Sequence, residues 1–293
     1  MTKSKDTLKE FVGDVIQAMV HNDKDWTKMF GDAKTLPARN AVTNKRYKGI
    51  NYWMLHAKTH KNNFSNNLWA TYKQWATVNA PVISGPGSST TIVYYKPPVY
   101  KENKEKGKVE LLSRSILSAA SVFNVDQVDL TNSSYKVPTR NTTQYSIDEI
   151  DNFVGGVDVK IINEDHNSCY YNETKDLINM TPKEKFINTT DADATQHYYA
   201  TLFHELTHAT KHAKRLNRKA QFQDDAHKSY AYEELVAELG SVLLSQHFGQ
   251  TKTVRENHAK YLNSWIEALQ KDFTFLTSAA QKASAAVEFY IKD

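Results

Sequence analysis

The sequence is poor in cysteine and has no long apolar run. Cys169 is the one cysteine among 293 residues, which excludes an internal disulfide and leaves any zinc site to histidine and carboxylate ligands. No apolar run reaches the roughly 18 residues that a membrane helix needs. The N-terminus also lacks the apolar core and the cleavage site of a signal peptide. We therefore expect a soluble, cytoplasmic protein without a membrane partner.

Acidic residues are missing from one long stretch of the N-terminal half. Residues 33–100 contain nine Lys and Arg and ten aromatic residues, but no Asp or Glu. Residues 1–150 carry 21 Lys and Arg against 13 Asp and Glu, whereas residues 151–293 carry 16 against 20. This asymmetry indicates a polyanionic partner for the N-terminal half.

Cations mixed with aromatic rings are typical of a groove for single-stranded nucleic acid, where cations follow the phosphates and bases stack on the rings. The same residue types also occur in strand cores and on ordinary surfaces, so a purely structural interpretation competes. Tyr72 belongs to the wider aromatic set, and Trp53 and Trp75 are open to a core role. The candidate DNA contacts are Arg39, Asn40, Arg46, Tyr47, Lys48, Asn51, Trp69, Lys73 and Gln74.

Two histidines in the C-terminal half have the spacing of a metal-binding helix. The motif His-Glu-x-x-His is formed by His204, Glu205 and His208. On a helix the two histidines lie one turn apart on the same face, so both can bind one metal ion while Glu205 faces the bound water. An ordinary amphipathic surface helix is the alternative, but apolar residues flank the motif, and buried His and Glu need partners. The pattern therefore favours a catalytic metal site.

A catalytic zinc ion takes three protein ligands, so the two histidines need a third partner. The segment 232–238 (YEELVAE) supplies Glu234 and Glu238, four residues apart on a second expected helix. We expect Glu234 to bind the metal and Glu238 to orient a ligand imidazole. The reverse order, or a role for Glu233, stays open because spacing alone does not determine which face of the helix points to the metal.

Two more side chains are candidates for stabilising the oxyanion of a peptide-hydrolysis reaction. Tyr230 and His227 lie in the expected loop before the second helix. In this reaction Glu205 takes a proton from metal-bound water, which attacks a peptide carbonyl. Two histidines and one carboxylate favour Zn²⁺ as the cofactor, with Mn²⁺ and Co²⁺ as alternatives.

Several segments of both halves together resemble one protein family. They are 37–40 (PARN), 47–51 (YKGIN), 69–74 (WATYKQ), the turn at Gly85, 122–127 (VFNVDQ), 170–172 (YYN), 180–186 (MTPKEKF), 198–210 (YYATLFHELTHAT) and 233–240 (EELVAELG). The combination resembles the ArdC-like antirestriction proteins of plasmids and phages, which are related to the N-terminal part of TraC-type plasmid primases. The resemblance implies a domain that binds single-stranded DNA, joined to a zincin-like metallopeptidase domain. It also implies protection of mobile-element DNA against host restriction, and it makes Glu234 the third ligand through a Glu-x-x-Ala pattern.

One departure from the family pattern lies just after the histidine motif. Family members typically carry Gly where this sequence has Lys211. We therefore expect the helix to continue through His212. That histidine extends the row by one more turn, but we expect it to be structural.

The expected fold is α+β in two domains, with residues 1–138 binding single-stranded DNA and residues 139–293 forming the zincin-like domain. The Thr- and Asn-rich segment 132–145 places the boundary. Helical spacing predicts helices over 4–31, 254–276 and 279–291, and short strands are predicted at 157–162, 168–171 and 176–180.

Three functions compete at this point. The first is an antirestriction protein that binds single-stranded DNA and cleaves an unknown protein substrate, for which a host restriction protein or another DNA-bound protein is a candidate. The second is a non-enzymatic protein that coats single-stranded DNA and holds a structural metal. The third is a peptidase whose basic half selects an acidic protein substrate, and it would bind DNA weakly.

Overall fold

The computed structural model of the chain describes residues 3–22, 26, 36–96, 99–103, 108–113, 116–138, 145–164, 168–190, 192–222, 225–250 and 259–291. Its helices are α1 (Lys3–Asn22), α2 (Ile50–Lys61), α3 (Tyr72–Thr77), α4 (Ile147–Gly155), α5 (Ala194–Ala209), α6 (Ala226–His247), α7 (Ala259–Lys271) and α8 (Thr274–Tyr290). Its strands are β1 (Arg39–Asn40), β2 (Leu68–Thr71), β3 (Thr90–Lys96), β4 (Val99–Asn103), β5 (Lys108–Ser113), β6 (Ile116–Asn124), β7 (Lys160–Asn163), β8 (Tyr170–Asn172) and β9 (Leu177–Met180). Helices and strands are mixed along the chain, so the predicted α+β class is confirmed.

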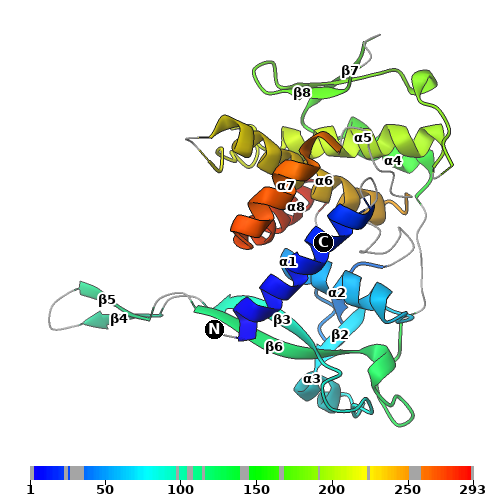
Figure 1. Cartoon of the computed structure of the whole chain (residues 1–293). Coiled ribbons are helices and arrows are strands. Elements are labelled where there is room, and N and C mark those ends of the chain that lie inside the picture. Colours follow the sequence, from blue (N-terminus) through cyan, green and yellow to red (C-terminus); the bar gives the residue numbers. More distant parts are fainter. Residues whose placement is uncertain are drawn as a thin grey trace.

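Two sheets lie at opposite ends of the molecule, with most of the helices between them (Figure 1). In the N-terminal sheet the order is β1-β2-β6-β3, with β1 parallel to β2 and the other pairs antiparallel. In the C-terminal sheet the order is β7-β9-β8, with β7 parallel and β8 antiparallel to β9. Helices α1 and α2 pack on the first sheet, and α5 packs on the second. The β4–β5 hairpin projects away from the body (Figure 1).

The N-terminal and C-terminal halves share one hydrophobic core. Trp53 and Trp69 of the N-terminal half belong to the same buried cluster as Tyr232 and Trp265 of the C-terminal half. Trp26 packs edge-on against Trp265, with ring centroids 6.1 Å apart. Helix α1 contacts α7, and α2 contacts α8. The apolar side chains of each half are therefore covered in part by the other half.

Polar contacts join the halves at the start of α2. The backbone N–H of Gly49 donates to Ser284 Oγ over 3.0 Å, and Gly49 has a φ of 56°, in the left-handed region that favours glycine. In the first turn of α2, the buried hydroxyl of Tyr52 donates to Gln246 Oε1 on α6. Helix α2 therefore contacts the helix that carries the predicted third metal ligand.

Helices α5 and α6 approach each other very closely. A Cβ atom on Gly240 would lie 2.4 Å from Cγ2 and 2.5 Å from Oγ1 of Thr207, so only glycine fits there. One residue further along α6, Ser241 Oγ donates to the carbonyl of Ala200 over 2.8 Å. This contact sets the distance between the two helices that carry the predicted metal ligands.

Some element boundaries differ from the sequence-based expectations. The helix expected over 4–31 ends at Asn22, and Phe30 lies outside the described residues. The helix expected over 254–276 is wrong in its extent: α7 ends at Lys271, and Asp272 Oδ1 accepts from the backbone N–H of Thr274, where α8 begins. The three short strands appear as β7, β8 and β9. In the part of the chain that is described, no helix has the length and apolar character needed to span a bilayer.

Candidate metal centre and nucleic-acid surface

Two buried helices carry the predicted metal ligands. Helix α5 starts at a capping box in which Asp193 accepts from the backbone N–H of Gln196. His204, Glu205 and His208 are all buried on this helix, with 3 %, 3 % and 8 % of their surface exposed. Helix α6 packs along α5 and carries the predicted carboxylate ligands. Polar side chains buried this deeply need partners, and the two histidines find theirs across the contact between the two helices.

Three donor groups converge at this contact. Nε2 of His204 and Nε2 of His208 lie 3.0 Å apart. Oε2 of Glu234 lies 3.5 Å from the first nitrogen, and Oε1 lies 3.3 Å from the second. Among the described residues, these three side chains form the one group of His, Cys, Asp or Glu that could hold a metal ion, with donor atoms within 4.8 Å of one another. Two imidazoles and a carboxylate fit a divalent cation, and this donor set leaves a coordination position for water.

Each imidazole presents its other nitrogen to a carboxylate on α6. Nδ1 of His204 lies 3.6 Å from Oε2 of Glu238, which was predicted to orient a ligand. Nδ1 of His208 lies 3.3 Å from Oε1 of Glu233, the residue whose role the sequence left open. The bond to Glu233 is of the kind that fixes the tautomer and the orientation of a metal-binding histidine, whereas Glu238 makes a longer charge contact with His204. Both rings therefore direct Nε2 towards the same point.

The ionisable groups of the centre stabilise one another's charge. Burial disfavours a charged imidazole, but hydrogen bonds with Glu233 and Glu234 outweigh it and raise the pKa of His208 to about 9. Burial also favours a neutral Glu234, but hydrogen bonds from His204 and His208 hold its pKa far below the usual value. The pKa of Glu233 is lowered against burial by His208 and by the charge of Arg218. The carboxylates thus favour positive charge at this site.

The two predicted oxyanion donors lie on α6 and not in a loop before it, which corrects the sequence-based expectation. Tyr230 lies one turn before Glu234, and its hydroxyl accepts a hydrogen bond from Tyr261 over 3.3 Å. Burial, this hydrogen bond and the nearby charge of Glu234 raise the pKa of Tyr230. His227 is exposed and lies two turns before Glu234, about 10 Å along the helix axis. The structure thus brings Tyr230 closer than His227 to the predicted ligands.

His212 does not join the two predicted metal-binding histidines of α5. Helix α5 ends at Ala209, so the expected continuation of the helix through His212 is wrong. Nδ1 of His212 lies 3.7 Å from Oδ2 of Asp176, outside the metal-binding group. The side chain of Arg215 donates to the carbonyl of Ala209 over 2.7 Å and so stabilises the end of the helix. A cation at the C-terminus of the helix explains why the helix ends although Lys211 stands where family members typically carry glycine.

Several predicted DNA contacts gather at the β1 edge of the N-terminal sheet. Asn40 donates to Oε1 of Gln74 over 3.1 Å and to the hydroxyl of Tyr47 over 3.2 Å. Arg39, beside Asn40, donates to the carbonyl of Asn44 over 2.8 Å and pairs through its backbone with Arg46. Lys73 is exposed next to Gln74 on α3. Together Arg39, Asn40, Arg46, Tyr47, Lys73 and Gln74 form a surface that we name the basic edge.

Two other predicted contacts, Trp69 and Asn51, have structural roles, and a third, Lys48, lies at an exposed ion pair. Trp69 is fully buried, and its ring N–H donates to Asn67 Oδ1 over 2.6 Å, so it cannot stack on a base. The amide of Asn51 bonds to both backbone groups of Val93, at 2.7 and 2.8 Å, and closes the open edge of β3. Lys48 forms a 2.9 Å ion pair with Glu288 on α8, but 59 % of its side chain is exposed, so its predicted contact with DNA stays a prediction. Tyr72, 62 % exposed beside Lys73, is a better stacking surface than Trp69.

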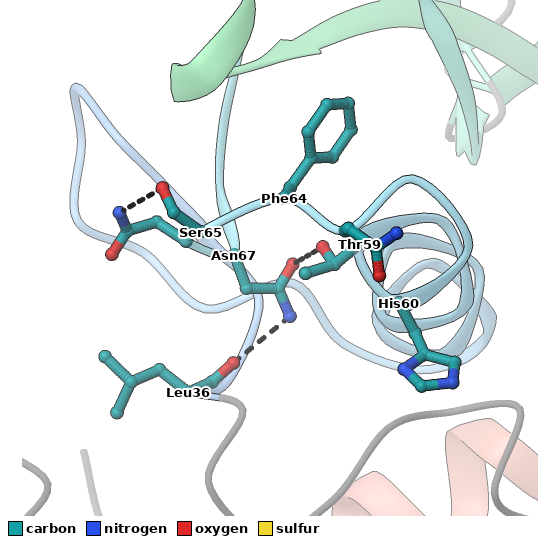
Figure 2. Close-up of a pocket in the computed structure, with 8 residues that line it drawn as sticks. Leu36, Thr59, His60, Phe64, Ser65 and Asn67 are labelled. Atoms are coloured by element: carbon teal, nitrogen blue, oxygen red, sulfur yellow. Dashed lines mark hydrogen bonds between the residues drawn. The ribbon is translucent and has the colours of Figure 1, made fainter.

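A polar hollow of about 250 Å³ lies at the end of α2, within the stretch that lacks acidic residues (Figure 2). The amide of Asn67 crosses it, accepting from Thr59 Oγ1 over 3.0 Å and donating to the carbonyl of Leu36 over 3.1 Å (Figure 2). Asn67 is also the acceptor of the Trp69 ring N–H. These internal bonds occupy the polar groups of Asn67, so this residue stabilises the fold and does not read a ligand.

Comparisons with known proteins match both halves. Residues 5–123 match the family model for the N-terminal domain of the anti-restriction factor ArdC, and residues 148–282 match a zincin-like metallopeptidase. The metal-free crystal structure of the antirestriction protein ArdC from plasmid R388 superposes with a TM-score of 0.75 and 28 % identity, over 97 % of this chain and 96 % of that one. The chain belongs to the ArdC-like proteins. Its two parts are therefore an ArdC N-terminal domain and a zincin-like domain.

Further relatives of this ArdC-like chain extend the comparison. The Mn(II)-bound structure of R388 ArdC matches with a TM-score of 0.73 and 27 % identity, over 99 % of this chain and 97 % of that one. DNA primase TraC of Escherichia coli is 32 % identical over 270 residues, which are 86 % of this chain but 24 % of the primase. The uncharacterized protein y4eC of Sinorhizobium fredii is 28 % identical over 88 % of this chain and 82 % of its own length. The expected relation to TraC-type primases is confirmed, and the chain spans about a quarter of that primase.

Sequence reasoning missed two residues of the centre. Arg218, 6 % exposed, lies 2.5 Å from Glu233 and holds it in place, while Tyr261 reaches Tyr230 from α7. Neither residue belongs to a local motif, because each contact joins residues far apart in the sequence. The predicted domain boundary at 138 falls between the two matched segments and stays a prediction.

Proposed function

We propose that this ArdC-like chain is a cytoplasmic antirestriction protein of a plasmid or phage. Its N-terminal half binds single-stranded DNA, and its C-terminal half hydrolyses a protein substrate with the help of a divalent metal ion. The observation that carries the proposal is the convergence of two buried imidazoles and the half-buried carboxylate of Glu234, with Glu205 next to His204 on α5. The likeness to R388 ArdC over nearly the whole chain supports the antirestriction role, and the Mn(II)-bound structure of that protein supports metal binding.

The metal would be held by Nε2 of His204, Nε2 of His208 and the carboxylate of Glu234. When bound, such an ion lowers the pKa of a water molecule and shares the charge of the oxyanion. The donor set favours zinc. The Mn(II)-bound relative makes manganese the first alternative, ahead of cobalt.

Two side chains would handle protons and charge during hydrolysis. The charge of Glu205 contributes to the raised pKa of His208, so its carboxylate lies close to the ligands. We assign Glu205 the proton of the attacking water, which it then passes to the leaving amine. Tyr230 is 56 % exposed beside Glu234, and it would donate a hydrogen bond to the carbonyl oxygen as that oxygen gains charge. His227 is the weaker candidate for this role because it lies further away.

The DNA half would bind through the basic edge together with Tyr72. Arg39 and Lys73 supply cations for phosphates, and Tyr72 supplies an exposed ring for an unpaired base. Arg46 is the weaker candidate, because its Nε is buried and its charge acts on the buried Tyr52. The amide of Asn40 is occupied by internal bonds to Gln74, Tyr47 and the backbone of Val42 and Thr43. Asn40 and Gln74 would therefore shape this edge and hold its cations in place. The protein substrate is unknown. A restriction protein or another DNA-bound protein of the host would be brought to the metal centre by shared DNA.

The test is Glu205→Gln in the full chain. We expect this variant to bind zinc and single-stranded DNA like the wild type, but to lose peptide hydrolysis and protection of incoming DNA. Hydrolysis would be followed on candidate host restriction proteins in the presence and absence of single-stranded DNA. Full hydrolysis by the variant would refute the assignment of Glu205.

The same variant separates the main proposal from its two rivals. Protection that survives in Glu205→Gln would support a DNA-coating protein with a structural metal. Weak DNA binding without strand preference, combined with hydrolysis of an acidic protein, would support a conventional peptidase. A site with three protein ligands favours catalysis over a structural role, because structural zinc sites are usually closed by four.

A further inference from the structure

We infer that Arg218 is a positioning residue of the metal centre, which acts through Glu233 on the imidazole of His208. The inference rests on the proposed function in one respect: it assumes that His204, His208 and Glu234 hold the metal. It adds two residues to the centre and gives them a role that can be measured by metal affinity alone.

Arg218 joins three groups from the two helices. Its Nη2 lies 2.5 Å from Oε1 of Glu233 and donates to the carbonyl of Thr207 over 3.1 Å. Its Nη1 donates to Oγ1 of Thr210 at the end of α5. The side chain is 6 % exposed. The planar guanidinium therefore links the end of α5 to the helix that carries Glu233, with little room to move.

The loop after α5 folds back to bring Arg218 to this place. The backbone N–H of Leu216 bonds to the carbonyl of Thr210 over 2.9 Å, and that of Arg218 bonds to the carbonyl of Lys211 over 3.0 Å. Asn217 has a φ of 48°, in the left-handed region where asparagine is tolerated. The loop is therefore closed by its own backbone, and it presents Arg218 to α6 in one orientation.

The link to His208 runs through a single oxygen atom. Oε1 of Glu233 lies 2.5 Å from Arg218 Nη2 and 3.3 Å from His208 Nδ1. A carboxylate held by arginine keeps its position and its charge, so it favours the tautomer with the proton on Nδ1. Nε2 of His208 then presents its lone pair to the metal. Lysine would keep the charge but not the planar fork, so it should not replace Arg218.

Arg215 offers a matched control at the same end of α5. Its side chain is fully buried, and it donates to the carbonyls of Ala209 and Asp158 over 2.7 and 2.6 Å. It also pairs with Asp176. Asp158 and Asp176 lie just before strands of the C-terminal sheet, and Ala209 contributes its backbone carbonyl at the end of α5. These contacts involve neither the His208 imidazole nor Glu233, and Asp176 belongs to the His212 cluster and not to the metal-binding group. Loss of Arg215 should therefore affect the fold but not the orientation of His208.

The experiment measures Zn²⁺ affinity of the full chain by competition with a chromogenic chelator, together with thermal unfolding of the metal-free protein. We expect Arg218→Lys and Glu233→Gln each to weaken Zn²⁺ binding about 10- to 100-fold. Arg215→Lys should lower the unfolding temperature but leave Zn²⁺ affinity within about twofold of the wild type. Because Arg218 acts through Glu233, the double variant should lose about as much affinity as one single variant, and not the product of both losses.

The outcomes separate the inference from the proposed function. Wild-type affinity in Arg218→Lys, or an equal loss in Arg215→Lys, would overturn the positioning role and leave the proposed function standing. Multiplicative losses in the double variant would show that Arg218 does not act through Glu233 and would also overturn it. A wild-type chain without Zn²⁺ or Mn²⁺ affinity would instead refute the metal site itself. Glu233→Gln keeps the inference testable if Arg218→Lys does not fold.

Discussion

Replacing Gly240 with alanine tests whether the close contact between α5 and α6 builds the metal centre. The new Cβ would lie 2.4 Å from Cγ2 of Thr207 and 3.0 Å from its Cβ, whereas carbon atoms pack best at about 3.5–4.0 Å. The helices must therefore separate by about 1 Å. Overpacking of this kind costs about 1–3 kcal/mol, and the better helix propensity of alanine returns up to about 1 kcal/mol. We expect a net loss of about 1–2 kcal/mol in the free energy of unfolding.

The same shift should weaken the metal centre. Thr207 lies between His204 and His208 on α5, and Gly240 lies two residues after Glu238 on α6. A displacement of about 1 Å moves the carboxylates away from the imidazoles, and misplacements of that size can cost about 100-fold in function. Urea denaturation and Zn²⁺ titration of Gly240→Ala would measure both effects.

Two further variants make the Gly240→Ala test specific. Gly13→Ala is the control, because Gly13 lies inside α1 and a Cβ there meets nothing within 4 Å; it should gain about 0.5–1 kcal/mol. Thr207→Ala removes the atoms that clash, so the double variant Thr207→Ala/Gly240→Ala should recover most of the metal affinity. If Gly240→Ala unfolds like the wild type and binds Zn²⁺ equally well, the reasoning is wrong.

Three other predictions follow from the described contacts. The double variant Tyr72→Ala/Lys73→Ala should leave the fold intact and weaken single-stranded DNA binding, measured by fluorescence anisotropy. Trp69→Ala should instead lower thermal stability, because Trp69 is buried. Unchanged DNA affinity in the double variant would refute the proposed role of the basic edge. Asn51→Ala removes two hydrogen bonds from β3 and should cost about 1–3 kcal/mol in urea denaturation, and a neutral result would contradict its structural role. Against burial, Arg215 and Tyr171 hold the pKa of Asp176 below its usual value. This stabilisation is present above the unfolded pKa of about 3.9 and is lost as pH falls through the folded value, so melting curves of Asp176→Asn and wild type should converge at low pH and stay apart near neutrality.

The metal ligands could be predicted because their spacing is local. His204 and His208 are one turn apart on one helix, and Glu234 follows from the pattern on the next. Local spacing says nothing of Arg218, whose contact with Glu233 depends on how the loop after α5 folds back. It also left Glu233 open, although Glu233 proved to be the partner of the second histidine.

The N-terminal half was harder to predict for a different reason. Composition identifies a basic, aromatic segment but does not tell a buried ring from an exposed one. Trp69 and Tyr72 are three residues apart, yet the first lies on a central strand and is fully buried, while the second begins α3 and is 62 % exposed. The burial of Trp69 comes from packing that includes Phe64, whose ring centroid is 5.7 Å away. Only tertiary structure supplies that information.

The shared core has a consequence for the expected DNA-binding domain, residues 1–138. Trp26 and Tyr52 are 0 % and 5 % exposed, and they contact Trp265 and Gln246 of the other half. Aromatic side chains bury about 150–250 Å² each. If these two side chains lose half of that burial in the fragment, its free energy of unfolding falls by on the order of 5 kcal/mol, at about 25 cal/mol per Å². Small domains have only about 5–15 kcal/mol of stability.

We therefore expect fragment 1–138 to be poorly folded when it is expressed alone, with a broad thermal transition and exposed apolar surface that binds a fluorescent dye. The full chain should show one cooperative transition under the same conditions, because the halves stabilise each other. A fragment that melts cooperatively and binds single-stranded DNA as tightly as the full chain would contradict this expectation. Binding and hydrolysis should accordingly be measured on the intact protein, where α2 links the sheet of the DNA half to the helix that carries Glu234.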